Sequence, residues 1–579
     1  MDFLRKILVK PFESAWPLLA VLSVPAVLLG WFGLTQLGIT EPVDVIPAEL
    51  VKGVCEFLFI GIFLSLYQLI GFKNKWLLGA CAFVYYLTLT ADLVLLMYFK
   101  ERFGAKYLDT LQGGDYHFLT DWRVLLYLAT LASFSFGAVR VFFKAETRKT
   151  AAHRLGICAA GTLLIYLANP LWLLPAPANF YGAYMTPPSP VYTVRAVLTR
   201  QPAAHLTKEI PADVQKLAQQ YNVFTARQTP VGKNYMRVIL IASESLSNKY
   251  LHHFNLNIPP QASAPLDKLY ENNPSASLKH VSLSTLYGLS VIFTSHPFVR
   301  LAYENNYPFS FVKELQKNGF HTAFLRGANE TYMNEHLIFK SAGFDEVIGA
   351  TYFNTRDDYK NYVNWWGLLD RKLFDYALEY LRIHKNTPTF VTILTVDSHS
   401  PLGRLDYLGE KYREIDERFY TEPTLPRAFA RFGQDVERFL NQLAMQGLLD
   451  DDTLVLIMPD HPAYANTPTN ALFEPYQPQF DNLPFIIVTK EKITAPVSQS
   501  ELLSQLDIAP TVLDLLNLEI PRGMFGHSIF DTRARRSVFD VKEDYAIITT
   551  AGGQQVVPFP PRQPAQRQLL NLMRTFVAE

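Results

Sequence analysis

The chain has 579 residues, 49% of them hydrophobic, and its 53 basic and 53 acidic side chains give a formal net charge of +0. That length exceeds one ordinary domain, so we expect several domains. The balanced charge lacks the basic excess typical of proteins that bind nucleic-acid backbones, and we expect no nucleic-acid partner.

Five apolar runs fill most of the first 175 residues. They span residues 16–37, 55–72, 76–98, 124–143 and 155–174. Each run is close to the about 20 residues that cross a bilayer as a helix. Buried core helices are the alternative, but five successive runs with almost no internal charge favour a membrane. We therefore predict a transmembrane domain with five helices over residues 1–175.

The basic residues beside these runs predict the orientation of the domain. Lys and Arg gather before the first run and in the second and fourth loops, whereas the first loop is mainly acidic. Because basic loops stay in the cytoplasm, everything after about residue 176 is expected outside it. This topology fits the cytoplasmic (inner) membrane of a bacterium. The first run lacks a convincing cleavage site and is expected to remain as an anchor.

The composition changes twice after the membrane region. Residues 176–235 are rich in Pro, Tyr and polar residues and form a predicted juxtamembrane linker, with one short amphipathic helix over residues 212–220. That helix could lie on the membrane or pack on the following domain. The domain predicted at residues 236–550 alternates short apolar runs with amphipathic segments. Residues 551–579 are expected to form a C-terminal tail.

Five short apolar runs predict strands that are buried on both faces, a pattern typical of parallel sheet. They are residues 237–243, 321–326, 389–396, 453–459 and 483–489. The helices predicted between them include residues 309–319, 366–384 and 426–447. This alternation predicts an alkaline phosphatase-like α/β fold class, with a mainly parallel central sheet and helices on both faces.

Acidic residues and imidazoles follow three of these strands at the point where each strand ends. Glu244 follows the first strand, Asp397 and His399 follow another, and Asp460 and His461 follow a third. Sites in open α/β sheets form at the carboxyl ends of strands. Glu244, Asp460 and His461, together with one hydroxyl oxygen, would complete a four-ligand shell suited to Zn²⁺ or Mn²⁺.

Hydroxyl groups crowd the start of a predicted apolar helix. Ser282, Ser284 and Thr285 could each cap the free backbone N–H groups of its first turn. One of them could instead be a nucleophile, because metal coordination lowers the pKa of a hydroxyl and a helix N-terminus attracts anions. Ser245, beside Glu244, is expected to cap the helix that follows it.

Residues from about 235 to 530 resemble the alkaline phosphatase and sulfatase superfamily. They look most like its membrane-anchored branch, the lipoteichoic acid synthase-like phosphoglycerol and phosphoethanolamine transferases. The matching motifs, in order, are ILIASES (239–245), the helix from Thr285 to Thr294-Ser295, GFDEVIG (343–349), WGLLDRKLFD (366–375), SHSP (398–401), PDH (459–461), SQLDIAPTVLDLLNL (504–518) and GMFGHSIFD (523–531). The five preceding spans resemble the same branch.

The resemblance implies one divalent metal and a set of ligands for it. The ligands would be Glu244, Thr285, Asp460 and His461, and the metal Zn²⁺ or Mn²⁺, with Mg²⁺ as a further candidate. Thr285 would also be the catalytic nucleophile. Its spacing to the small-residue pair at the end of the helix favours it over Ser284.

The resemblance also implies residues that contact the substrate. His399 matches a family histidine that contacts the substrate phosphate or assists the leaving group, so we assign it catalytic and substrate-binding roles. Arg326, Asn329 and Asn334 follow a strand at the place where family members carry substrate-binding side chains. Trp366 and its neighbour at position 365 are expected in the core.

Departures from the superfamily's patterns narrow the chemistry. Sulfatases need a Cys or Ser with Pro two residues on and Arg four residues on, whereas Thr285 is followed by Leu-Tyr-Gly-Leu. This departure excludes a sulfatase. Lipid A phosphoethanolamine transferases usually carry disulfides in the exported domain, but Cys55, Cys81 and Cys158 all lie in predicted spans. This difference favours the lipoteichoic acid synthase-like group.

These observations predict a membrane-bound, metal-dependent transferase. It would move a phosphoethanolamine or phosphoglycerol head group from phosphatidylethanolamine or phosphatidylglycerol through a phosphothreonine at Thr285. The acceptor would be an envelope glycan, a lipopolysaccharide or lipooligosaccharide, or a lipid-linked sugar, and we expect a monomer. Two alternatives stay open: a catalytically inactive sensor or scaffold of the same fold, and a membrane phosphodiesterase that passes the head group to water.

Overall fold

The computed structural model divides the chain into two units, residues 1–200 and residues 201–579. In the second unit it describes residues 205–224, 231–282, 284–298, 309–331, 335–363, 366–399, 425–463, 477–534, 536–541, 545–558, 561 and 563–577. In the first unit it describes short helical pieces within residues 60–85 and 151–158. Most residues of the five predicted spans lie outside the described residues. Among the residues that are described, no helix has both the length and the apolar character needed to cross a membrane.

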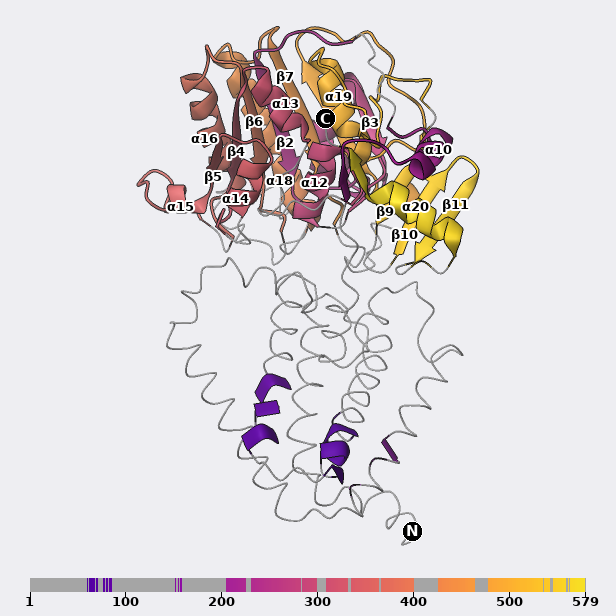
Figure 1. The fold of residues 1–579 in the computed structure, drawn as a ribbon. Helices are drawn as coiled ribbons and strands as arrows, with labels where there is room; N and C mark the ends of the chain where they lie inside the picture. The colour runs from indigo at the N-terminus through magenta and orange to yellow at the C-terminus, as the bar shows by residue number, and fades with distance from the viewer. Residues whose placement is uncertain are drawn as a thin grey trace. The chain divides into compact units, whose positions relative to one another are not determined.

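Seven strands form the central sheet of the second unit (Figure 1). In spatial order they are β3 (Ser275–Leu278), β8 (Leu483–Thr489), β7 (Thr453–Pro459), β2 (Arg237–Ser243), β6 (Thr389–Leu394), β4 (His321–Arg326) and β5 (Glu346–Ile348). Strands β7, β2, β6, β4 and β5 pair in parallel, whereas β8 runs antiparallel to both of its neighbours. The predicted α/β fold with a mainly parallel sheet is confirmed.

The five predicted strands coincide with β2, β4, β6, β7 and β8. Four of them have the predicted bounds, and β6 ends two residues early, at Leu394. Every residue of β2, β6 and β7 is buried, which explains why each is a continuous apolar run. The sequence did not reveal β3 and β5, because these edge strands are short and partly exposed.

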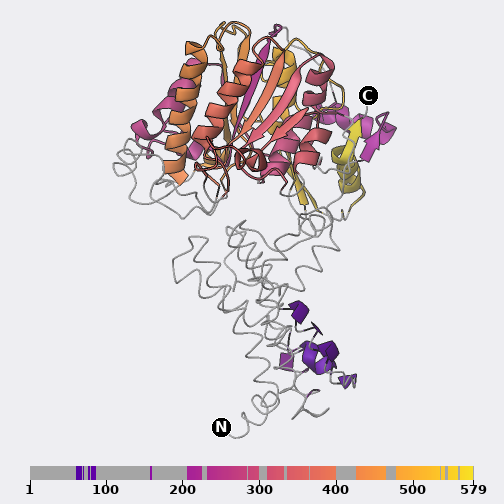
Figure 2. The same cartoon turned by 90° about the vertical axis from the view of Figure 1, so that its left-hand side faces the viewer.

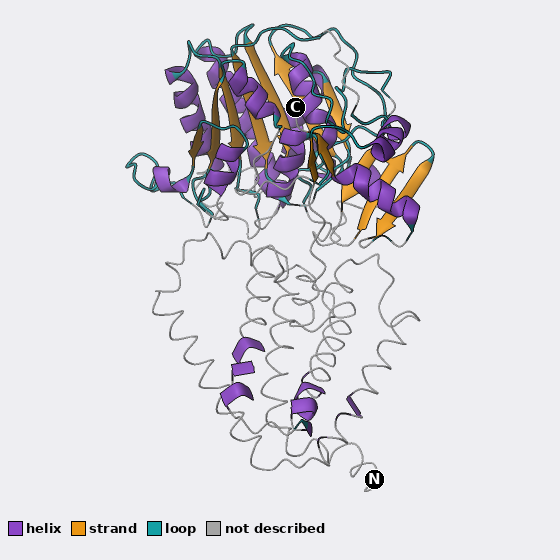
Figure 3. Cartoon of the chain, viewed as in Figure 1, coloured by secondary structure: helices purple, strands orange, loops and turns teal. Residues whose placement is uncertain are grey.

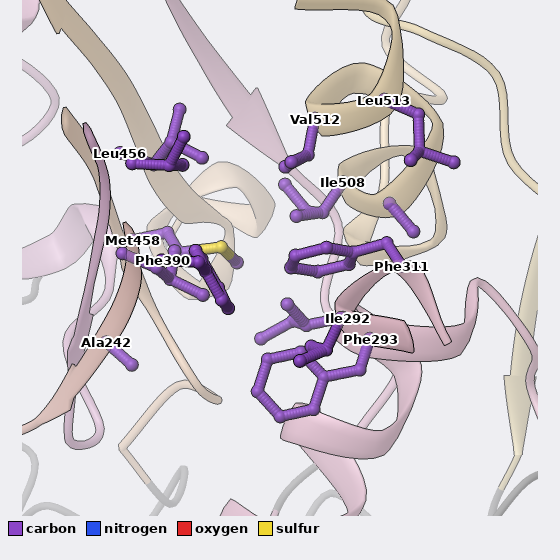
Figure 4. Packing of buried hydrophobic residues seen from close by; sticks show 14 of the residues in the cluster. Ala242, Ile292, Phe293, Phe311, Phe390, Leu456, Met458, Ile508, Val512 and Leu513 are labelled. Carbon is purple, nitrogen blue, oxygen red and sulfur yellow. The ribbon is translucent and has the colours of Figure 1, made fainter. Parts of the chain in front are cut away.

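Helices cover both faces of the sheet (Figure 3). One face carries α12 (Thr285–Thr294), α13 (Phe311–Lys317) and α19 (Ile508–Leu515). Figure 4 shows helix side chains meeting strand side chains there; those labelled are Ile292, Phe293, Phe311, Ile508, Val512 and Leu513, and Ala242, Phe390, Leu456 and Met458. Full burial of one large apolar side chain stabilises a fold by roughly 1.5–3 kcal/mol. This packing fixes α12, and therefore Thr285 at its start, against the sheet.

The opposite face carries α11 (Pro260–Asn272), α16 (Asp370–Ile383) and α18 (Leu425–Met445), seen together with the sheet in Figure 2. Phe374 of α16 and Phe439 of α18 pack together, with ring centroids 5.1 Å apart. Both predicted helices on this face are present, although α16 begins four residues later than expected. The four residues before it form a turn that contains two β-bridge partners, Gly367 and Leu368.

A smaller module stands beside the central sheet. Its antiparallel sheet contains β9 (Val538–Val541), β10 (Tyr545–Thr550) and β11 (Gly553–Pro558), and two helices pack with it, α10 (Ala212–Tyr221) and α20 (Pro564–Arg574). Strand β12 (Thr575–Val577) pairs in parallel with β1 (His205–Thr207). The remaining described elements are η4 (Asn248–Tyr250), α14 (Glu335–Ser341), α15 (Ala350–Phe353), η8 (Pro478–Asp481) and η9 (Gln505–Asp507).

This module changes one boundary expected from the sequence and shows where one expected helix packs. Residues 551–579 are not a tail, because they contain β11, α20 and β12, and the boundary at residue 550 falls inside the β10–β11 hairpin. The apolar face of α20 requires burial and finds it in the core of this module. The amphipathic helix expected in the linker is α10, and its buried face packs in the same core.

Candidate active site

Three chain segments converge at the carboxyl edge of the sheet. Glu244 directly follows β2, and Asp460 and His461 directly follow β7. These strands are neighbours, and their last residues, Ser243 and Pro459, are paired in register. Thr285 is the first residue of α12. The sequence therefore delivers two carboxylates, an imidazole and a hydroxyl to one place through sheet register and one packed helix.

The four side chains form one cluster. One ligand atom each from Glu244, Asp460 and His461 lies within 4.8 Å of the other two. The hydroxyl Oγ1 of Thr285 donates to Glu244 Oε2 at 3.2 Å and lies 3.4 Å from His461 Nε2. His461 Nε2 is 3.2 Å from Glu244 Oε1 and 3.6 Å from Asp460 Oδ2. The structure thus brings together all four residues predicted to hold the metal.

Burial perturbs every titratable group in this cluster. Burial, and then the nearby charge of Glu244, raises the pKa of Asp460 to about 7. Burial acts to lower the pKa of His461, but Asp460 and Glu244 outweigh it and raise that pKa to about 9. For Glu244 burial acts upward, yet the imidazoles of His399 and His461 bring its pKa below the usual range. Two carboxylates in one buried site favour a positive charge between them.

The donor set fits a divalent cation. Asp460 Oδ2 is buried and accepts no hydrogen bond among the described residues, so the carboxylate has one oxygen available for another partner. Its other oxygen accepts from the backbone N–H groups of Ser245, at 3.0 Å, and His461, at 2.8 Å. Two carboxylates, one imidazole and one hydroxyl are ligands that Zn²⁺ and Mn²⁺ accept. The residues present therefore fit the metal that the resemblance implies.

Neighbouring polar groups fix the position of Glu244. Its backbone N–H donates to the hydroxyl of Thr395 at 3.0 Å, and its carbonyl accepts from the hydroxyl of Ser398 at 2.6 Å. Ser245 donates from its hydroxyl to Glu244 Oε1 at 2.6 Å. Ser245 does not cap a helix, contrary to expectation, since Ser247 precedes η4 and Ser245 has a left-handed φ of 60°. Its side chain instead orients the Glu244 carboxylate.

Gln505 connects two of the segments that build the site. Its side-chain amide donates to the Asp460 carbonyl at 2.6 Å and accepts from the Val281 N–H at 2.8 Å. The residue is fully buried in η9, and its own N–H donates to the Lys279 carbonyl at 3.1 Å. Gln505 thus ties the loop that leads to Thr285 to the loop that carries Asp460. No local signal in the sequence marks Gln505, because the polar residues Ser504 and Asp507 stand beside it.

The hydroxyls around Thr285 have different roles. Ser282 Oγ donates to the Ser284 carbonyl and accepts from the Ser284 N–H, both at 3.1 Å, and so closes a turn. Ser284 is the N-cap residue of α12, yet its side chain makes no capping hydrogen bond. The hydroxyl of Thr285, by contrast, contacts the side chains of Glu244 and His461.

The predicted substrate-binding residues lie in different surroundings. The His399 ring contacts Trp366, with ring centroids 4.2 Å apart. The same imidazole is close enough to Glu244 to lower the pKa of that carboxyl. Arg326, the last residue of β4, forms an ion pair with Glu335. Substrate binding by His399 and Arg326 stays a prediction.

Two asparagines were also predicted to bind substrate. Asn329 Oδ1 accepts from both the backbone N–H and the hydroxyl of Thr331 at 2.9 Å, which closes a local turn. Asn334 lies outside the described residues. Substrate binding by these two side chains remains a prediction.

The comparisons with known proteins relate this part of the chain to a known family. Residues 237–518 match the sulfatase family model. This part of the chain is therefore similar to a sulfatase domain, as its motifs predicted. The matched segment contains Glu244, Thr285, Asp460 and His461.

Several individual relatives carry the names of transferases. Phosphoglycerol transferase I of Salmonella arizonae is 28% identical over 240 residues, covering 40% of this chain and 29% of that protein. The Salmonella choleraesuis protein of the same name is 26% identical over 244 residues, with the same coverage of both chains. The chain thus spans less than a third of the length of these relatives. The lipooligosaccharide phosphoethanolamine transferase A of Neisseria meningitidis, an integral membrane protein, shares the fold at 15% identity and a TM-score of 0.52, covering 86% of this chain and 94% of that one.

Proposed function

We propose that the chain is a membrane-bound phosphotransferase that moves a phospholipid head group to a hydroxyl of an envelope glycan or glycolipid. One observation carries the proposal: the Thr285 hydroxyl, at the N-terminus of α12, touches both Glu244 and His461. A hydroxyl in this position can attack phosphorus, and the helix N-terminus behind it stabilises the phosphate anion.

In the first step the Thr285 oxygen attacks the phosphorus of the phospholipid. The bond between phosphorus and the diacylglycerol oxygen breaks, and the head group becomes a phosphodiester on Thr285. The hydroxyl proton leaves Thr285, where Glu244 already accepts its hydrogen bond, and the departing diacylglycerol oxygen takes up one proton. His399, whose segment is bound to Glu244 through Ser398, would supply that proton.

In the second step an acceptor hydroxyl attacks the same phosphorus. Its oxygen forms the new phosphodiester, the bond to Thr285 breaks, and the threonine hydroxyl recovers a proton. The net reaction exchanges one phosphodiester for another and consumes neither water nor an oxidant. The same histidine would now accept the proton of the attacking hydroxyl, as a general acid does when the reaction runs in reverse.

Glu244, Asp460, His461 and Thr285 would hold one divalent metal, Zn²⁺ or Mn²⁺, with Mg²⁺ as a further candidate. When bound, such an ion lowers the pKa of the coordinated hydroxyl and neutralises charge on the phosphoryl oxygens. Ser245 and the backbone of residue 461 would keep both carboxylates oriented for it.

The names of the relatives support two candidate head groups, phosphoglycerol and phosphoethanolamine. The sequence relatives are named phosphoglycerol transferases, and the structural relative is a phosphoethanolamine transferase. The donor would accordingly be phosphatidylglycerol or phosphatidylethanolamine. The five apolar runs and the basic residues beside them support anchoring in the bacterial cytoplasmic membrane, with this domain outside the cytoplasm. The protein would act as a monomer.

Donor cleavage by the purified full-length protein tests the proposal. Liposomes of phosphatidylglycerol or phosphatidylethanolamine with labelled acyl chains, supplied with Mn²⁺ or Zn²⁺, should release labelled diacylglycerol. Without acceptor, mass spectrometry should find the head-group phosphate on Thr285. The Thr285→Ala protein should give neither product, whereas Ser284→Ala should give both, because that side chain makes no capping bond.

Three results would contradict parts of this proposal. Diacylglycerol release by Thr285→Ala at the rate of the unmodified protein would exclude Thr285 as the nucleophile. Release without transfer to any glycan would favour the phosphodiesterase. No release from either lipid would favour the inactive scaffold.

A further inference from the structure

The indole ring of Trp366 lies against the imidazole of His399. Their ring centroids are 4.2 Å apart and the ring planes are tilted by 59°. Both side chains are partly exposed. The core position expected for Trp366 from the sequence is met only in part, because its side chain is neither fully buried nor exposed. Neither the metal-ligand cluster nor the nucleophile uses this aromatic surface.

The backbone that carries Trp366 is held tightly against the end of β4. Gly367 has a φ of +150°, and a Cβ at that position would lie 2.1 Å from the Gly327 carbonyl oxygen. The next residue, Leu368, donates from its N–H to the same carbonyl at 2.9 Å. The indole is thus presented by a fixed turn.

Two buried aspartates join the Trp366 turn to the His399 turn. The Asp370 carboxylate accepts from the N–H groups of Val396, at 2.7 Å, and Asp397, at 3.1 Å. In return the Asp397 carboxylate accepts from the Asp370 N–H at 3.1 Å. These reciprocal bonds fix Trp366 and His399 relative to each other, and Ser398 binds the second turn to the Glu244 carbonyl. The aromatic surface therefore has a constant position beside the site.

We propose that Trp366 forms the subsite for the sugar ring that bears the acceptor hydroxyl. This inference rests on the proposed head-group transfer. A partly exposed indole offers a flat face with negative π density, which attracts the weakly positive C–H groups on one face of a sugar ring. Ligand sites commonly combine such an apolar aromatic surface with a few polar groups that fix orientation.

The position next to His399 supports an acceptor in preference to the head group. His399 is the residue assigned to protonate the leaving oxygen and to deprotonate the attacking one. A ring that touches this imidazole is close to the group attached to that oxygen. In the second step that group is the acceptor sugar.

Acceptor competition with the full-length protein tests this subsite. Liposomes of phosphatidylglycerol or phosphatidylethanolamine serve as donor, and the acceptors are a β-linked glucose tetrasaccharide, an N-acetylglucosamine tetrasaccharide and glycerol. The release of diacylglycerol and the amount of acceptor that carries the head group are measured together. Trp366→Ala should lower transfer to a tetrasaccharide, relative to diacylglycerol release, by about 10-fold, the scale of one lost apolar contact. The variant should have a higher KM for the tetrasaccharide. Trp366→Phe should restore most of the lost transfer. Transfer to glycerol should change least.

The matched control is Tyr362→Ala, an exposed aromatic residue nearby in the sequence, which should behave as the unmodified protein does. Equal losses of diacylglycerol release and transfer in Trp366→Ala would overturn the subsite and assign Trp366 to holding His399. Unchanged transfer would overturn it as well, as would an unmodified protein that transfers to glycerol but to neither sugar. An unmodified protein that releases no diacylglycerol would refute head-group transfer itself.

Discussion

Gly288 of α12 packs directly on the backbone carbonyl of Asp460, so closely that a Cβ added to Gly288 would lie 2.0 Å from that oxygen. The contact is between two segments that each carry part of the candidate site. Helix α12 presents Thr285, and the β7 loop presents Asp460 and His461. The absence of a side chain at position 288 therefore sets how near the hydroxyl can approach the carboxylates.

We expect Gly288→Ala to separate these two segments. The added methyl meets backbone, which cannot rotate away, and overpacking of this kind costs about 1–3 kcal/mol of stability. Donor cleavage should fall by more than the loss of folded protein explains, because Thr285 moves away from Glu244. Gly552→Ala is the control, since a Cβ there has an ordinary 3.7 Å contact with Thr550. Normal cleavage by Gly288→Ala would show that the close contact does not position the nucleophile.

Asp460→Asn should change stability in opposite directions with and without metal. In a chelator, burial and the charge of Glu244 disfavour the ionised Asp460, so the neutral amide should raise the melting temperature. With Mn²⁺ or Zn²⁺ the order should reverse, because the unmodified site gains more from the ion. Loss of a residue that only hydrogen-bonds to a metal ligand typically lowers metal affinity by about 10- to 100-fold. Calorimetric titration of Asp460→Asn should show a larger reduction, because Asp460 would itself be a ligand.

The control for this experiment is Asp451→Asn, which removes an exposed carboxylate that pairs with Lys490 at 3.4 Å. It should leave both metal affinity and the order of melting temperatures unchanged. If Asp460→Asn binds Mn²⁺ and Zn²⁺ as tightly as the unmodified protein, Asp460 is not a ligand.

Gln505 should act on the site through Asp460 and Val281. Gln505→Leu leaves a buried carbonyl and a buried N–H without partners, which costs about 1–3 kcal/mol for each group. Gln505→Glu keeps the acceptor for Val281 but loses the donor to Asp460. We expect both variants to weaken metal binding by about 10- to 100-fold, as outer partners of ligands do. Gln554→Leu, on exposed β11, is the control. Unchanged metal affinity in both Gln505 variants would reduce this residue to a packing role.

The sequence could predict the central sheet because its strands are buried on both faces. The continuous apolar runs of β2, β6 and β7 follow directly from that burial. Parallel neighbours deliver the residues after each strand to a common edge, so the proximity of Glu244 to Asp460 and His461 could be anticipated. Thr285 could be anticipated as the start of an apolar helix.

Features set by long-range contacts could not be predicted from local patterns. The antiparallel direction of β8 depends on its neighbours, because a buried strand has the same apolar pattern in either direction. Pairing of β1 with β12 joins the two ends of the second unit, and no local pattern announces it. The left-handed φ of Ser245 and the bridging amide of Gln505 each depend on partners more than 40 residues away in the sequence. The contact of Trp366 with His399 likewise requires the turns after two different segments to meet.

His296 should make the attachment of the C-terminal strand sensitive to acid. Its buried ring donates from Nε2 to the Thr575 carbonyl at 2.8 Å and accepts at Nδ1 from the Phe298 N–H at 3.1 Å. Burial lowers the pKa of His296 from 6.5 to about 4. Since both ring nitrogens are already used, a second proton at Nδ1 would break the bond from Phe298.

The direction of the pH effect follows from these pKa values. His296 binds a proton near pH 6.5 in the unfolded chain and near pH 4 in the folded chain. The neutral His296 therefore contributes its full stabilisation of the folded state above pH 6.5. This stabilisation is lost progressively as the pH falls towards 4, with a limit of about 3 kcal/mol for the difference between the two pKa values. Hydrogen exchange of the β12 and α12 amides in the full-length protein should therefore accelerate between pH 7.5 and pH 5, after correction for intrinsic rates.

A neutral replacement separates this effect from general acid sensitivity. The amide of His296→Gln can donate to Thr575 but does not titrate, so its local opening free energy should vary less between pH 7.5 and pH 5. At pH 7.5 it should open more easily than the unmodified protein, because an amide fills the ring cavity poorly. His253→Gln, a partly exposed histidine paired with Glu271, should keep the unmodified pH dependence. If His296→Gln keeps the full acceleration in acid, another group controls the attachment of β12.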